Sequence, residues 1–204
     1  MTESTFETPS DGTHVPQLLV SVRSADEAIA ASAGGCQILD VKEPSFGSLG
    51  KADNCVIDCV LQTGLQAGIP VSAALGEVTD YSPLLYKENL NAGLPESFSQ
   101  LSFTKLGLAG LCRDSNWSTR WQDTMSFLTE SFSESMDSSF HQWVAVIYAD
   151  WEQAAAPSPD AILDSILSSK LSPEIEIAGI LVDTWSKTSG RLLDAIDVEH
   201  LRGL

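Results

Sequence analysis

The sequence has few of the residues from which metal sites and nucleophilic dyads are built. Its four cysteines form no CxxC pair, and its three histidines are scattered along the chain. Cys55 and Cys59 are spaced to share one face of a helix, which leaves metal ligation open, but no histidine lies nearby and free thiols are the commoner case. The pattern therefore predicts no metal site and no Ser-His or Cys-His catalytic pair.

Basic residues and long apolar runs are also scarce. The 204 residues include 11 Lys and Arg against 28 Asp and Glu, a net charge of −17 that would repel a nucleic-acid backbone. No apolar run approaches the roughly 20 residues that span a bilayer. Residues 1–16 have neither a basic start nor an apolar segment, so we expect a disordered tail and a cytoplasmic protein.

Apolar segments alternate with helical patterns along the rest of the chain. Strand-like segments occur at 17–22, 36–42, 69–75, 101–106, 142–149 and 175–182. Helical patterns occur at 25–33, 54–66, 116–132 and 160–169, a further helix begins at 190, and 80–100 gives only a poorly defined helical region. This alternation predicts βαβ units and a parallel sheet, either doubly wound or curled into a barrel.

The strand ends favour the barrel. The first strand is followed by Ser-Val-Arg-Ser, so the GxGxxG turn of a dinucleotide-binding Rossmann sheet is absent. We predict no bound cofactor. Charged residues end several strands, as in TIM barrels. We therefore predict a TIM (β/α)8-type barrel over 17–204 with about six βα units. Such barrels typically need about 250 residues, so we expect either that the chain is truncated or that the barrel closes by an unusual route, such as pairing with another copy.

The segment 36–50 carries the first candidate site. Asp40 and Lys42 alternate with Leu39 and Val41, so their side chains point to the same face, roughly 6.6 Å apart along the strand. Charged groups are rarely buried without a partner or a purpose. Pro44 then ends the strand.

A second lysine and a later loop extend this site. If the strands of Lys42 and Lys105 face one interior, the two amines approach each other, and mutual repulsion with desolvation lowers a lysine pKa enough for Schiff-base chemistry. Asp40 and Asp183 would then balance charge and shuttle protons, while Lys187 would bind an anionic group or act as acid or base. Ordinary alternatives remain open: a structural ion pair, a solvated lysine, and helix caps at Glu77 and Asp150, to which we assign no role.

Several segments resemble one enzyme family. GGCQILDVKEPSFGSLG, IPVSAALGE, TKLGLAG, VAVIYAD and LVDTWSKTSGRLLD, taken in order, resemble (5-formylfuran-3-yl)methyl phosphate synthase over about 17–194. The resemblance implies a TIM barrel and a lyase of methanofuran biosynthesis that condenses two molecules of glyceraldehyde 3-phosphate. It also implies two further strands, which this sequence lacks, and marks 113–140 as an addition to the family core.

The resemblance assigns roles to five residues. The Schiff-base lysine falls on Lys42 and its companion aspartate on Asp40, while Lys105, Asp183 and Lys187 match the other motif positions. Thr188-Ser189 stands where the family commonly has Asp-Gly. The implied ligand is a phosphosugar, with a homo-oligomer as an open possibility. The alternatives are an inactive or partner-dependent barrel fragment, and a class I aldolase acting on another phosphosugar.

Overall fold

The protein is an α/β structure with a single parallel sheet. The computed structural model describes residues 15–81, 94–132, 142–168, 175–188 and 190–199. Its strands are β1 (Leu19–Val22), β2 (Ile38–Val41), β3 (Val71–Glu77), β4 (Phe103–Gly107), β5 (Gln142–Tyr148) and β6 (Glu176–Asp183). They pair in the order β1-β2-β3-β4-β5-β6, and every pairing is parallel. The six predicted strands are thus confirmed.

Helices follow most of the strands. They are α1 (Ala25–Ala33), α2 (Asn54–Ala67), α4 (Trp117–Phe132), α5 (Pro159–Leu167) and the short α6 (Leu192–Ala195), with 3-10 turns at Pro44–Phe46, Val78–Asp80 and Glu96–Gln100. The helix expected from 190 is therefore one turn long within the described residues. Most of the region 80–100, like the tail 1–14, lies outside them.

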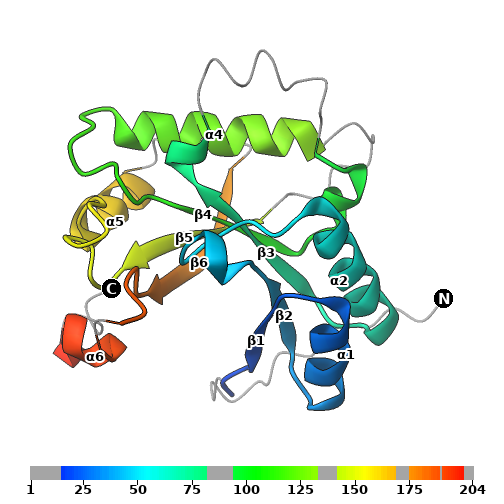
Figure 1. The fold of residues 1–204 in the computed structure, drawn as a ribbon. Coiled ribbons are helices and arrows are strands. Elements are labelled where there is room, and N and C mark those ends of the chain that lie inside the picture. The colour runs from blue at the N-terminus through cyan, green and yellow to red at the C-terminus, as the bar shows by residue number, and fades with distance from the viewer. Residues whose placement is uncertain (1–14, 82–93, 133–141, 169–174, 189, 200–204) are drawn as a thin grey trace.

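The two faces of the sheet differ in what covers them. One face packs on the helices in a cluster that includes Leu39, Leu106 and Ala145 with Ile57 of α2 and Trp121 of α4. The opposite face carries the second, smaller apolar cluster and the buried charges, and loops rather than helices pack on it. Figure 1 shows α1, α2, α4 and α5 arranged around the outside of a curled sheet.

This arrangement is a partial TIM-type barrel. A doubly wound sheet reverses its strand order at a switch point and carries helices on both faces. Here the strand order follows the sequence without reversal, and α1, α2, α4 and α5 all contribute to the apolar cluster on one face. β6 remains at least partly exposed along its whole length. The sheet is therefore a curled half-barrel whose concave side is available for chemistry.

The loop after β2 folds back over the carboxyl end of β3. The N–H of Glu43 donates to the carbonyl of Gly50 at 2.8 Å, and the N–H of Gly76 donates to the carbonyl of Leu49 at 2.9 Å. Gly50 has no room for a side chain, because a Cβ there would lie 2.1 Å from the carbonyl oxygen of Glu43. The loop therefore has one compact path, which places Ser48 above the concave face.

Candidate active site

A buried ion pair joins β2 and β4 on the concave face. The Lys105 amine donates to Oδ1 of Asp40, and the hydroxyl of Ser21 on β1 donates to Oδ2 of the same carboxylate at 3.0 Å. Asp40 is 2% exposed and Lys105 is 3% exposed. Both oxygens of the carboxylate are thus occupied, and Asp40 and Lys105 themselves are shielded from water.

The pair spans the intervening strand β3 because that strand has small side chains at this level. Ser72 lies beside Asp40 in the register, and Ala74 lies beside Lys105. Both are buried and neither is large enough to separate the charges. A bulky residue at either position would occupy the space through which the Lys105 side chain reaches Asp40.

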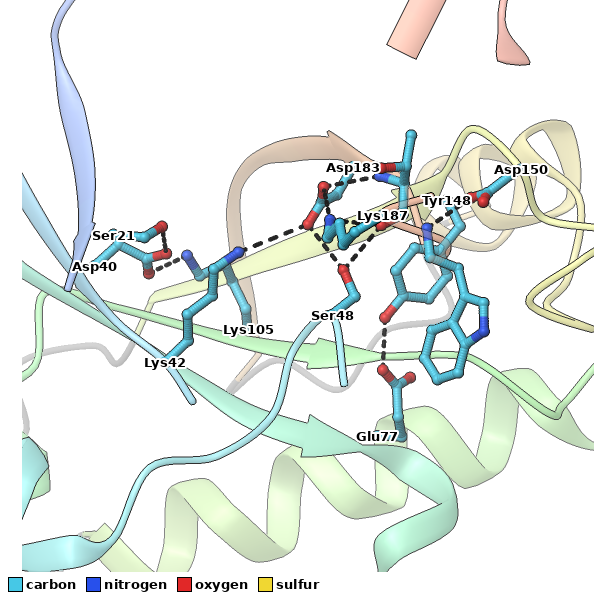
Figure 2. A network of polar contacts seen from close by, with 12 residues as sticks. Ser21, Asp40, Lys42, Ser48, Glu77, Lys105, Tyr148, Asp150, Asp183 and Lys187 are labelled. Atoms are coloured by element: carbon cyan, nitrogen blue, oxygen red, sulfur yellow. Dashed lines mark hydrogen bonds and ion pairs between the residues drawn. The ribbon is translucent and has the colours of Figure 1, made fainter. Parts of the chain in front are cut away.

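A second cluster of charges lies beside this pair. The amine of Lys42, directly after β2, is 3.9 Å from Oδ2 of Asp183, and the amine of Lys187 donates to Oδ1 of Asp183 at 2.6 Å. Figure 2 shows Lys42 and Lys105 side by side, with their amines between Asp40 and Asp183. The Lys42 side chain is 18% exposed, against 4% for Lys105, so Lys42 is the amine that a substrate reaches more readily.

The surroundings shift the pKa values of this cluster. Burial lowers the pKa of Lys105; Asp40 opposes that shift, and the nearby Lys42 cation adds to it. Burial alone would raise the pKa of Asp183, but hydrogen bonds from Lys187 and from the N–H of Thr184, with the charges of Lys187 and Lys42, hold that pKa below its usual value. Asp183 is therefore ionised in the resting site.

Asp150 holds the loop that carries Asp183 and Lys187. Its carboxylate accepts the N–H groups of Trp185 at 2.6 Å and Ser186 at 2.9 Å. The N–H of Ala149 also donates to the carbonyl of Asp183 at 2.8 Å. Asp150 thus fixes the start of the loop after β6 without touching the lysines of the site.

Glu77 connects three strand ends next to the site. Its Oε1 accepts the hydroxyl of Tyr148 at 2.5 Å, and its Oε2 accepts the N–H of Ala109 at 2.9 Å. The Tyr148 ring meets the ring of Trp185 edge to face, with centroids 5.6 Å apart. Burial raises the pKa of Glu77, although both donors oppose that shift. The Glu77 carboxyl therefore ties together the ends of β3, β4 and β5.

The structure brings all five sequence-predicted residues to one side of the sheet. However, it does not pair Asp40 with Lys42, the two charged residues that are neighbours on one face of the strand. Asp40 and Lys42 share a face, yet Asp40 is bonded to Lys105 while Lys42 faces Asp183. The sequence analysis missed Ser48, whose hydroxyl lies 3.0 Å from Oδ2 of Asp183. Its signal was present in the segment GSLG, which follows the DVKEP motif after two intervening residues.

Other predicted features can be located in part. Within the described residues, no group of three or more His, Cys, Asp or Glu side chains is placed to hold a metal ion. All four cysteines are free thiols, and of these Cys36 alone is buried. Among the helices of the described part of the chain, none has both the length and the apolar character to cross a membrane.

Comparison with known proteins identifies the family. A family model described as 4-HFC-P synthase matches residues 18–204. The chain belongs to this family. It is 29% identical over 188 residues to a protein of Methanopyrus kandleri named (5-formylfuran-3-yl)methyl phosphate synthase, a match that covers 91% of this chain and 71% of that relative.

Two further relatives of the 4-HFC-P synthase family carry the same name. The protein of Methanosarcina mazei is 28% identical over 187 residues, covering 91% of this chain and 72% of the relative. The protein of Methanococcus maripaludis is 30% identical over 188 residues, covering 91% of this chain and 71% of the relative. The chain is thus a lyase-type enzyme of the 4-HFC-P synthase family, and the site described above is its candidate active site.

Proposed function

We propose that this chain condenses two molecules of glyceraldehyde 3-phosphate into (5-formylfuran-3-yl)methyl phosphate through a Schiff base at Lys42, as a step of methanofuran biosynthesis. The overall balance releases one phosphate and two waters. The observation that carries the proposal is the Lys42 amine, which reaches the concave face with a carboxylate oxygen of Asp183 3.9 Å away. An amine beside a carboxylate can form an imine and then exchange protons with it.

The remaining site residues take complementary roles in this proposal. Lys105 places a second positive charge beside Lys42 on the concave face (Figure 2). Asp40 neutralises Lys105 and keeps that charge in place. Lys187, whose side chain is 51% exposed, can contact an anionic substrate group or return a proton.

Borohydride trapping tests the imine. Treatment with glyceraldehyde 3-phosphate and borohydride should attach the reduced sugar phosphate to Lys42, which peptide mass spectrometry would locate. Lys42→Ala should lose both the adduct and the furan product. Lys51→Ala is the matched control, because Lys51 lies in the same loop but bonds to Asn54 and stacks on Phe98. A fully active Lys42→Ala, or an adduct on another lysine, would reject the proposal.

A second candidate is a chain that is active only when another copy completes the barrel. It is favoured by the open sheet: in the described residues β1 and β6 each pair with one neighbour, and β6 is partly exposed throughout. Product formation per chain should then rise with protein concentration, in step with the oligomer seen by light scattering. Constant specific activity from a monomer would reject this candidate. A related class I aldolase reaction would be distinguished by identifying the product.

A further inference from the structure

Two serine hydroxyls serve the two aspartates of the site in different ways. Ser21 donates to Asp40 at 3.0 Å, and the other oxygen of Asp40 is taken by Lys105. Ser48 lies 3.0 Å from Oδ2 of Asp183 and also 3.0 Å from the carbonyl oxygen of Thr184. A hydroxyl carries a single proton, so Ser48 can donate to only one of these acceptors at a time.

The choice between two acceptors allows Ser48 to follow the protonation state of Asp183. While Asp183 is ionised, the Ser48 hydroxyl donates to Oδ2. When Oδ2 carries a proton, the hydroxyl can turn to the Thr184 carbonyl and accept the new O–H from Asp183, since a serine oxygen is both donor and acceptor. Ser48 is 5% exposed, so no bulk water substitutes for it. Both states of the carboxyl therefore keep a hydrogen-bond partner.

We infer that Ser48 is the positioning residue that lets Asp183 accept and return a proton beside Lys42, by donating to Asp183 when it is ionised and to the Thr184 carbonyl when it is protonated. This inference rests on the proposed function. Oδ1 of Asp183 is already occupied by the Lys187 amine and the N–H of Thr184. Oδ2, which faces Lys42, is therefore the oxygen at which a proton can be exchanged.

The proton in question comes from the substrate. An iminium at Lys42 loses a proton from the carbon beside its C=N carbon. The C–H bonding pair becomes the C=C bond of an enamine, the C=N pair moves to nitrogen, and the proton joins Oδ2 of Asp183. After the enamine carbon bonds to the aldehyde carbon of the second substrate, the alkoxide formed takes the proton back. Asp183 must thus be stable in both forms during each turnover.

The groups around Asp183 favour such a cycle. Facing it are Lys42 from the end of β2, Lys105 of β4, Tyr148 of β5 and Lys187 of its own loop. The Lys42 cation helps to lower the pKa of Asp183. An iminium at Lys42 keeps this positive charge, which disappears when the iminium becomes a neutral enamine and Asp183 takes the proton. By contrast, both oxygens of Asp40 already accept hydrogen bonds within the fold, one of them from a buried amine, so neither oxygen is open to a proton from the substrate.

Titration of the Asp183 carboxyl by carbon-detected NMR tests the inference directly. Asp183→Asn identifies its signal. Ser48→Ala should raise the pKa of Asp183 by about one unit, because a hydrogen bond to the ionised form is lost and such bonds to charged groups are the stronger ones. Ser45→Ala is the matched control: this exposed hydroxyl of the same loop donates to the Glu43 carboxylate at 2.7 Å and does not touch the site. It should leave the pKa of Asp183 unchanged.

Kinetics supply the second measurement. In Ser48→Ala the acid limb of the kcat profile should move up in pH with the Asp183 titration, and kcat at its optimum should fall about tenfold with little change in KM. An unchanged Asp183 titration in Ser48→Ala overturns the inference, even if the variant loses activity or thermal stability. Absence of furan product from both the wild type and Ser45→Ala rejects the proposed function instead, and the NMR titration still decides the role of Ser48.

Discussion

Removing the carboxylate of Asp40 should destabilise the fold through the charge that it leaves on Lys105. The side chains of the pair are 3% and 4% exposed, so the stranded ammonium cannot reach water without moving the strand. Breaking a buried ion pair from one side costs about 3–5 kcal/mol. Asp40→Ala should therefore lower the free energy of unfolding by that amount at pH 7, measured by urea denaturation.

The pH dependence makes this prediction specific. In Asp40→Ala, Lys105 can avoid a buried unpaired charge by losing its proton. Deprotonating a lysine with an ordinary pKa of about 10.4 costs roughly 4.6 kcal/mol at pH 7 but roughly 1.9 kcal/mol at pH 9. Burial already lowers the pKa of Lys105 in the folded protein, and loss of Asp40 removes an opposing contribution. A lysine whose pKa is lower in the folded state than in the unfolded chain reduces the free energy of unfolding while the unfolded chain carries its charge. This loss becomes smaller as pH rises toward the pKa of the lysine in the unfolded chain. The destabilisation by Asp40→Ala should therefore shrink between pH 7 and pH 9.

Two further variants complete this experiment. Asp40→Ala combined with Lys105→Met removes the stranded charge and should recover part of the lost free energy. Asp26→Ala removes an exposed carboxylate in the first turn of α1 and should change stability by less than about 1 kcal/mol at either pH. A destabilisation by Asp40→Ala that is the same at pH 7 and pH 9 would refute the reasoning, because it would mean that no buried charge on Lys105 is involved.

Two other changes have outcomes that the structure specifies. Burial raises the pKa of Glu77 in the folded protein. The stability that Glu77 contributes is therefore fully present below its ordinary pKa of 4.5 and is lost as pH rises through its pKa in the folded protein. In Glu77→Gln the side chain stays neutral at every pH. The free energy of unfolding of this variant, minus that of the wild type, should therefore increase from pH 4.5 to pH 7 in urea titrations. A difference that is the same at both pH values would contradict this. Gly50→Ala would put a Cβ 2.1 Å from the Glu43 carbonyl oxygen and so displace the loop that carries Ser48. Its kcat/KM should fall about 100-fold, since a shift of about 1 Å at a catalytic group has that effect, and unchanged kinetics would show that the loop path is not required.

The elements of the fold could be predicted because each apolar run is short and bounded. Val71–Glu77 and Gln142–Tyr148 are strands buried along most of their length, as their continuous apolar character indicated. The strand 36–42 was also found, although β2 itself ends at Val41 and Lys42 already belongs to the following segment. Sequential pairing followed from the βαβ alternation.

The pairing of charges could not be predicted in the same way. Alternation along one strand put Asp40 and Lys42 on one face, but which lysine reaches Asp40 depends on the curl of the sheet and on the small side chains of Ser72 and Ala74 between β2 and β4. Ser48 was missed because a serine in a loop belongs to no repeating pattern of apolar and polar residues. Its position depends on contacts between residues distant in sequence. The hydrogen bond from Tyr148 to Glu77, between residues 71 positions apart, was hidden for the same reason.

The sequential order of the sheet has a consequence for how the site comes together during synthesis. Each strand pairs with the one made just before it, so the sheet can grow from β1 onward as the chain leaves the ribosome. Asp40 gains its buried partner only when β4 has been made, and Lys42 meets Asp183 only when β6 has been made. Charged residues of the earliest strands therefore wait for partners that are synthesised later, and the candidate active site is complete only once β6 has been made.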